Sequence, residues 1–195
     1  MKVLLHSIFL LMLAIFFSEC HKNNVYEEKS RSLDSLSGVV NSALRSFEKN
    51  VDSVVLEKSL LRFQYYREFI QQNINDTLNK PEADNLRRFY SSGKSLTDFA
   101  SNRKLVIQRL NLLNDQLTNL SKDVKEKLVE PERLVKYAAN EYLEVGKATD
   151  LADAQQKVYQ VNQEEFKNAL KGVENLIRSR NNGELPVIIK DTVSL

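Results

Sequence analysis

Apolar side chains recur along most of this chain at alternating steps of four and three residues. The clearest run lies in the middle and comprises Val106, Leu110, Leu113, Leu117, Leu120 and Val124. A similar run precedes it (Leu33, Leu36, Val40, Ala43 and Phe47, continuing through Val51 and Val54), and another follows it (Phe166, Leu170, Val173 and Ile177). This spacing puts the apolar residues on one face of a helix and lets helices pack at a shallow angle, as in a coiled coil. It predicts an all-α protein.

Further apolar residues lie beside these seams, and they widen each apolar face. They are Leu105, Ile107, Leu112 and Leu176. A face wider than the seam of a two-stranded coiled coil indicates that each helix contacts more than one partner. The pattern therefore favours a helical bundle.

Punctuating residues divide the chain into three segments of similar length, about 30–78, 80–129 and 131–180. Pro81 and Pro131 are each followed by an acidic residue, and proline is tolerated in the first turn of a helix. Asn79 and Glu82 have the spacing of a reciprocal capping pair. The sequence Asn181-Asn182-Gly183 is typical of a helix end. Both prolines are thus expected to start helices after tight reversals.

We expect three long, kinked helices in an elongated antiparallel bundle, about 70 Å long at 1.5 Å per residue. Two glycines leave an alternative open. Gly93 lies in a serine-rich stretch, and Gly146 is followed by Thr149 and Asp150, so either site could end one helix and cap the next. If the helices break there, the bundle has four to five shorter helices.

The N-terminus has the layout of an export signal. Lys2 supplies a positive start, residues 8–17 form an unbroken apolar run, and the chain becomes polar at His21. The run is about half of the roughly 20 residues that a helix needs to cross a bilayer. Residues 1–19 are therefore predicted to be a signal and not a permanent transmembrane anchor.

The only cysteine of the chain, Cys20, follows this apolar run and the small residue Ser18. This arrangement, over residues 1–20 only, resembles the signal of bacterial membrane lipoproteins. Phe17 stands where that family has an aliphatic residue, and Glu19 where it has Gly, Ala or Ser. The resemblance implies that Cys20 becomes the mature N-terminus and carries a diacylglyceryl anchor.

Two other interpretations of Cys20 stay open. The sequence Ser18-Glu19-Cys20 also fits the small-x-small site of the ordinary signal peptidase, and cleavage after Cys20 would release a soluble periplasmic or secreted protein. Cys20 could also be an incidental residue of a discarded segment. Each case excludes an intramolecular disulfide, because the chain has no second cysteine.

The predicted organisation is an export signal (1–19), a polar linker (20–29), a helical bundle (30–183) and an extended C-terminal tail (184–195). The tail contains the β-branched run Val187-Ile188-Ile189 and has no helical period. The whole chain has 28 basic and 26 acidic residues, a balance that argues against a dedicated nucleic-acid surface. Five glycines and three prolines in 195 residues leave few turns, which agrees with long helices.

The residue types of the predicted bundle exclude several catalytic classes. The two histidines, His6 and His21, both precede it, so it cannot form a Ser-His-Asp or Cys-His nucleophile site or a metal site with histidine ligands. It also has no glycine-rich phosphate loop. We therefore expect a protein that is not an enzyme and holds no metal or cofactor. An enzyme of unrecognised type is the alternative.

One cluster of aromatic and basic residues is a candidate binding site. A reversal near Asn79 would bring Phe69 level with Phe89, and Tyr66 close to Tyr90. The end of the third helix would arrive at the same level. This predicts a partner-binding tip, since Tyr, Phe and Arg are common in interface hot spots. The simpler interpretation is that the aromatics are core and the arginines extend over them into water. The tip comprises Phe63, Tyr65, Tyr66, Phe69, Arg87, Arg88, Phe89, Tyr90, Arg178 and Arg180, with Arg62 and Arg67 beside it.

These observations together lead us to expect a non-catalytic lipoprotein of the cell envelope that acts as a binding or spacer module. Its expected partners are the membrane, through the lipid anchor, and a protein of unknown identity. The expected oligomeric state is a monomer or weak oligomer.

Overall fold

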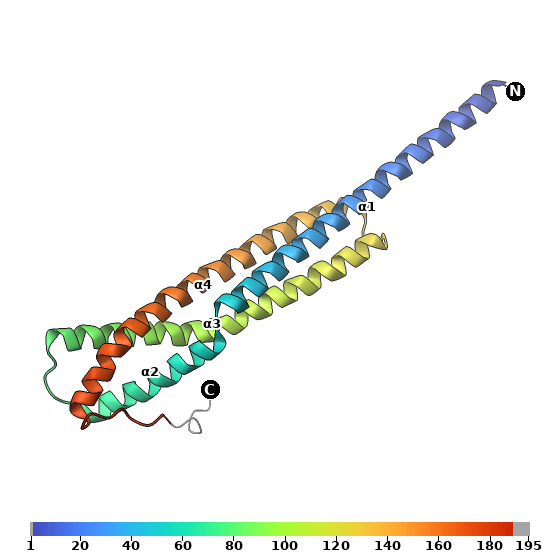
Figure 1. Ribbon diagram of the computed structural model, residues 1–195. Helices are drawn as coiled ribbons and strands as arrows, with labels where there is room; N and C mark the ends of the chain where they lie inside the picture. The colour runs from blue at the N-terminus through green and yellow to red at the C-terminus, as the bar shows by residue number, and fades with distance from the viewer. Residues whose placement is uncertain (1, 189–195) are drawn as a thin grey trace. The chain divides into compact units, whose positions relative to one another are not determined.

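The structure, a computed structural model, is all-α in its described part, which covers the backbone of residues 2–188 and the side chains of residues 24–188. The four helices are α1 (Lys2–Asn50), α2 (Ser53–Asn73), α3 (Lys80–Lys125) and α4 (Pro131–Arg180) (Figure 1). An all-α bundle is thus confirmed. None of the helices in the described part has an apolar stretch long enough to span a membrane.

The chain divides into two compact units. Unit 1 comprises Met1–Leu44 and Gln108–Asp150, and unit 2 comprises Arg45–Ile107 and Leu151–Leu195. Helices α1, α3 and α4 each contribute residues to both units.

Unit 1 packs three helical segments around a core of leucine and valine. In α1 and α4 these segments run antiparallel to α3, because Ser30 pairs with Ser121 while Ser37 pairs with Asn114, and Gln116 pairs with Glu141. The most deeply buried side chains of the unit are Leu33, Val40, Leu110, Leu117, Val124 and Leu134. Burying these aliphatic faces is the main stabilising contribution to the unit.

Unit 2 packs α2 between segments of α3 and α4 around an aromatic core. Phe47 at the end of α1, Phe99 of α3 and Tyr159 of α4 continue this core toward the start of α2, with ring centroids 6.3 and 5.1 Å apart in the pairs Phe47–Phe99 and Phe99–Tyr159. Ser59 and Tyr66 of α2 are bonded to Gln163 and Glu174 of α4 respectively, so these two helices run parallel.

The predicted starts of the second and third segments and the end of the third are confirmed, whereas α3 ends at Lys125, four residues before the predicted end of the second segment. The Asn79 backbone N–H donates to the Glu82 carboxylate at 2.9 Å, and the Glu82 N–H donates to the Asn79 side chain at 3.0 Å, which is the reciprocal capping pair that the spacing predicts. Pro131 is the first residue of α4. The helix ends at Arg180, before Asn182 and Gly183, which have φ angles of 52° and 88°.

The prediction of one helix over residues 30–78 was wrong, because the chain leaves helical geometry at Asp52. This residue is extended (φ −66°, ψ 107°), and its carboxylate accepts from the backbone N–H groups of Val54 and Val55, capping α2. Val51 stays buried and in step with Phe47, but the next seam residue, Val54, is exposed, so the buried face changes phase at the break. The four helices therefore replace the three that we expected.

Most residues of the predicted seams are buried, and a few are not. Val54 is 55% exposed because the new helix starts beside it, and the buried face of α2 uses Leu56, Phe63, Tyr66 and Ile70 instead. Ala43 and Leu120 are half-buried. Leu105 and Leu112 are 62% and 69% exposed, so they do not widen the core as predicted.

Gly93 and Gly146 both lie inside continuous helices, so the alternative of breaks at these glycines is wrong. The predicted linker, 20–29, is helical in the structure. Within it, Tyr26 contacts Val129 in the connection that follows α3, and just after it Ser30 contacts Ser121 of α3. The tail has no regular secondary structure over 184–188, and residues 189–195 lie outside the described part.

Candidate functional site

The predicted tip is built on α2, α3 and α4 of unit 2, and its aromatic residues form a closed core. Phe63, Phe89 and Phe166 are 7%, 0% and 1% exposed. The Phe89 and Phe166 rings stack with centroids 5.1 Å apart, and Phe63 lies 5.4 Å from Phe89 and 6.3 Å from Tyr90. Such pairs add favourable ring contacts to the burial of a large apolar area.

The predicted register between α2 and α3 was wrong by nearly two helical turns. Phe63, and not Phe69, lies level with Phe89. The reversal is centred between Asn73 and Lys80, because α2 ends at Asn73 and the residues up to Asn79 form a non-helical connection. Phe69 is half-buried and has no ring contact among the described aromatic pairs.

The two tyrosines of α2 differ in environment. Tyr66 is 3% exposed, and its hydroxyl donates to the Glu174 carboxylate at 3.3 Å. Burial, with the neighbouring Glu174 carboxylate, raises the pKa of Tyr66, so the phenol stays protonated and can only serve as a neutral donor there. Tyr65 is half-buried.

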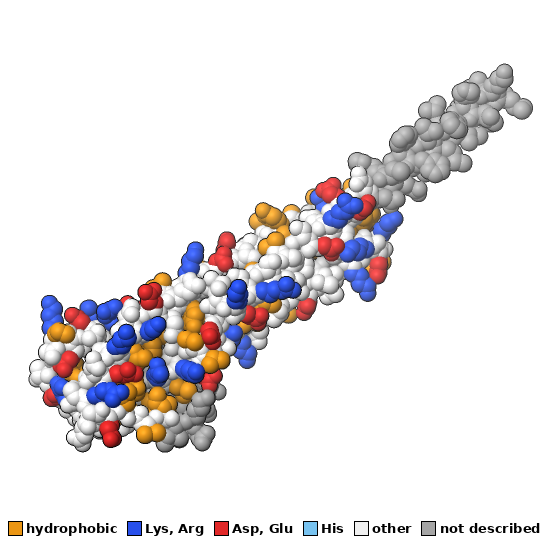
Figure 2. All heavy atoms as spheres, viewed as in Figure 1, with side chains coloured by type: hydrophobic (Ala, Val, Ile, Leu, Met, Phe, Trp, Pro, Cys, Tyr) orange, Lys and Arg blue, Asp and Glu red, His pale blue; other side chains and the backbone are white. Residues whose placement is uncertain are grey.

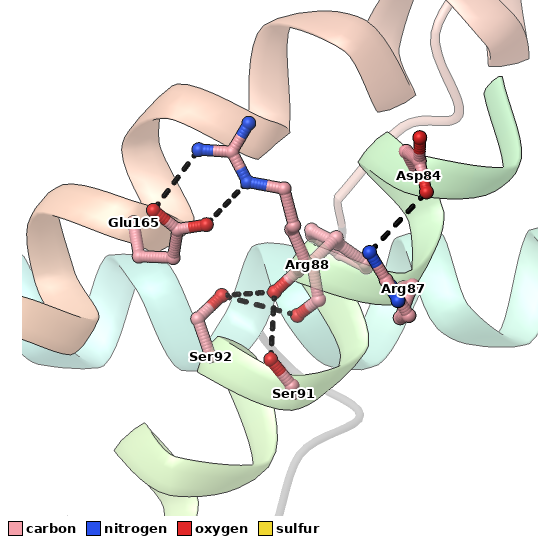
Figure 3. A network of polar contacts seen from close by, with 7 residues as sticks. Asp84, Arg87, Arg88, Ser91, Ser92 and Glu165 are labelled. Atoms are coloured by element: carbon pink, nitrogen blue, oxygen red, sulfur yellow. Dashed lines mark hydrogen bonds and ion pairs between the residues drawn. The ribbon is translucent and has the colours of Figure 1, made fainter. Parts of the chain in front are cut away.

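The arginines of the tip are held by carboxylates or carbonyls of unit 2. Arg88 binds both oxygens of Glu165 in α4, with one N–O distance of 3.0 Å, and Ser91 and Ser92 donate to the Arg88 carbonyl (Figure 3). Arg87 pairs with Asp84 on its own helix at 3.3 Å. The Arg88 guanidinium lowers the pKa of Glu165, so this ion pair persists through the neutral range.

Three further arginines, Arg67, Arg178 and Arg180, also have interaction partners in unit 2. Arg180 binds Asp76 of the α2–α3 connection at 2.7 Å and Glu82 at 3.6 Å. Arg178 donates to the Gly183 carbonyl at 3.2 Å, and the Arg67 guanidinium lies 5.5 Å from the centre of the Phe63 ring. Charged side chains of both signs are interspersed over the visible face of each unit (Figure 2). The packing of the aromatics and the pairing of the arginines agree with the simpler interpretation of this cluster as the packed end of unit 2.

Two contributors to this cluster were not predicted from the sequence. Phe166 was recognised as part of a seam but not as the ring that stacks on Phe89, and Glu165 was not recognised as the partner of Arg88. Adjacent positions on α4 supply both, and the signal that could have found them is the antiparallel register of α3 and α4.

A second group of polar contacts joins α1 and α3 in unit 1. The Ser121 hydroxyl donates to Asp34 at 2.6 Å, and Lys125 binds the same carboxylate at 3.0 Å. Further along, Ser37 and Asn41 both donate to the Asn114 side-chain oxygen, at 2.7 and 2.8 Å. The hydrogen bonds from Ser121 and then Lys125 lower the pKa of Asp34, which is therefore ionised near neutral pH.

Two cavities open beside these contacts. The larger, of about 410 Å³, is lined by Tyr26, Glu27, Ser30, Arg31, Asp34, Lys125 and Lys127. The smaller, of about 310 Å³, shares Asp34 and Lys125 with it and includes Lys122. Both are lined by polar and charged residues, and they were not predicted from the sequence because these residues belong to segments far apart in the chain.

Unit 1 also buries a carboxylate between α3 and α4. Glu141 is 7% exposed, and one of its oxygens accepts from the Gln116 amide, while the other has no hydrogen-bond partner in the described part. No group of three or more His, Cys, Asp or Glu side chains that could hold a metal ion occurs among the described residues. The side chain of Cys20 lies outside the described side chains.

In comparisons with known proteins, no family model, no curated protein and no solved structure matches this chain.

Proposed function

We propose that this protein is a lipoprotein of the bacterial cell envelope, held by a lipid on Cys20, and that it acts as a non-catalytic binding or spacer module. The observation that supports this most directly is the position of Cys20, the only cysteine of the chain, just after the apolar run of residues 8–17. The structure adds the continuity of α1. This helix runs from the signal segment past Cys20 into the core of unit 1, where Tyr26 donates to the Val129 carbonyl at 2.9 Å. A lipid on Cys20 would thus be joined to unit 1 by a helix without a flexible spacer.

The residue types of the described part support the non-catalytic part of the proposal. Residues 24–188 contain neither histidine nor cysteine, the side chains that most often act as bases or nucleophiles. Several charged residues form ion pairs with side-chain exposures of 41 to 78%, as expected for a solvated surface.

The test of the anchor is the variant Cys20→Ser. The wild-type mature protein should partition into the detergent phase with an intact mass that includes the acyl chains, and Cys20→Ser should be exported but stay in the aqueous phase. Two or more chains give stable anchoring where one gives only marginal binding, so the difference should be nearly all or none. A wild-type protein that begins at His21 and stays in the aqueous phase would instead support the secreted alternative.

If the protein acts as a spacer, we expect it to be an elongated monomer or weak oligomer, as the sequence predicts. Solution scattering of the mature chain measures both properties. A compact profile would contradict the spacer role while leaving the anchor untouched.

For the binding role, we propose that the protein partner binds at the tip, the end of unit 2 that carries the arginines. Arg87 is the most suitable residue to test, because its side chain is 78% exposed and its ion pair among the described residues is with Asp84 on the same helix. Arg87→Glu should reduce recovery of a partner from solubilised membranes, with a larger effect at low salt, where charges are less screened. Lys147→Glu is a matched control, since Lys147 also forms an exposed i,i+3 pair with an acid. Equal recovery with both variants would remove the tip as a binding site.

A further inference from the structure

Leu128, in the connection between α3 and α4, is an exposed apolar residue whose position the packing of unit 1 does not explain. The Leu128 N–H donates to the Asp123 carbonyl at 2.9 Å and the Lys127 N–H to the Val124 carbonyl at 3.0 Å, which together form a Schellman motif. Such a motif usually packs its last residue against an apolar side chain in the preceding turn. The residues available there are Asp123 and Lys122, and Leu128 is 69% exposed.

The same turn has a lysine, Lys127, at the position that glycine usually occupies in a Schellman motif. Lys127 has φ 56°, in the left-handed region that favours glycine. A lysine there carries a conformational penalty that glycine would avoid. The cations Lys122 and Lys125 also complement the C-terminal dipole of α3, and this accounts for them without any ligand. It does not account for Leu128.

The connection lies close to the predicted anchor. Tyr26 binds the Val129 carbonyl, and Tyr26 follows Cys20 by six residues on α1, a rise of about 9 Å. The headgroup layer on one side of a bilayer is about 5–8 Å thick, given the total and hydrocarbon thicknesses of a membrane. With α1 along the bilayer normal, a lipid on Cys20 therefore places Val129, and Leu128 beside it, at the outer edge of the headgroup layer.

The larger cavity of unit 1 lies at this same end and suits a phosphate group. Its lining includes Arg31, Lys125 and Lys127, against two carboxylates, Glu27 and Asp34. The lining thus contains three cations and two carboxylates, and its formal net charge is positive. Ser30 and Tyr26 add hydroxyl groups to the lining.

We propose that the α3–α4 connection is a second membrane contact, in which Leu128 enters the interface of an anionic bilayer and lipid phosphates meet the Arg31–Lys125–Lys127 cavity. This inference rests on the proposed lipid anchor. It extends that proposal by fixing which end of unit 1 faces the membrane: the end carrying the connection is held against the bilayer and not merely tethered above it.

The experiment uses the mature lipidated protein in vesicles of phosphatidylcholine, with and without phosphatidylglycerol. A polarity-sensitive fluorophore is attached to Leu128→Cys and, as a matched control, to Leu112→Cys. Both leucines are 69% exposed and lie in unit 1, so neither substitution should disturb the fold. The lipid occupies the Cys20 thiol, which leaves the introduced cysteine as the only site for the label.

We expect a blue shift, and quenching by a lipid-borne quencher, for the label on Leu128→Cys but not for the label on Leu112→Cys. Adding Lys127→Glu to Leu128→Cys should reduce both signals in anionic vesicles. A label on Leu128→Cys that reports water as strongly as the control would overturn the inference. Intact mass separates the two proposals: lipidated protein with a water-exposed label rejects only the membrane contact, whereas protein without lipid rejects both.

Discussion

The contact between Gly93 and Phe63 shows how one missing side chain positions the aromatic core of unit 2. A Cβ atom built on Gly93 would overlap the Phe63 ring, whereas one built on Gly146 would meet nothing within 4 Å. Gly93 therefore lets α2 place Phe63 directly against the backbone of α3, where it reaches Phe89 and Tyr90. In the sequence, Gly93 had suggested a helix break, because glycine is found both at helix ends and at close contacts between a helix backbone and a neighbouring side chain.

This difference predicts opposite effects of alanine at the two glycines. Gly93→Ala should lower the free energy of unfolding by about 1–3 kcal/mol, because the added methyl displaces a packed ring. Gly146→Ala should raise it by about 0.5–1 kcal/mol, because alanine is the better helix former and space is available. Urea denaturation followed by circular dichroism measures both. A Gly93→Ala variant as stable as the wild type, or more stable, would mean that the close approach of Phe63 to α3 is incorrect.

At the scale of the helices, ends with local signals were predictable and one break was not. The ends of α3 and α4 carry prolines, a capping pair and Asn-Gly residues, whose effects act within a few residues. The break before α2 depends on Asp52, a single capping residue between the predicted seam residues Val51 and Val54. In the sequence the apolar spacing runs on from Val51 to Val54 and so hides the break, after which Val54 is exposed and Leu56 is buried instead.

The role of Asp52 predicts the effect of removing its side chain. Asp52→Ala should lower the free energy of unfolding by about 1 kcal/mol, because the N–H groups of Val54 and Val55 lose their acceptor. Asp115→Ala is the control, an exposed aspartate inside α3 with no capping role, and should be neutral or slightly stabilising. The midpoints of thermal unfolding compare the two. A loss with Asp115→Ala as large as that with Asp52→Ala would mean that capping is not the cause.

At the scale of the whole molecule, the two units have cores of different composition. Unit 2 is closed by aromatic rings, and unit 1 combines leucine and valine with hydrogen-bonded serine, asparagine and a buried Glu141. Polar contacts between helices can define their register at some expense of stability. Basic and acidic residues are nearly equal in number, and in the structure many of them form ion pairs with each other within a single helix.

The sequence by itself determined the helical class, the starts of α3 and α4, the end of α4, and most buried residues of the seams, since these follow from backbone preferences and from spacing within one helix. It also limited the chemistry, because no histidine or cysteine lies beyond residue 21. Only the tertiary structure decided the register of Phe63 on Phe89, the pairing of Arg88 with Glu165, the exposure of Leu112 and Leu128, and the cavity beside Asp34. These features depend on how residues distant in the chain meet, and a shift of two turns between helices leaves the apolar pattern of each helix unchanged.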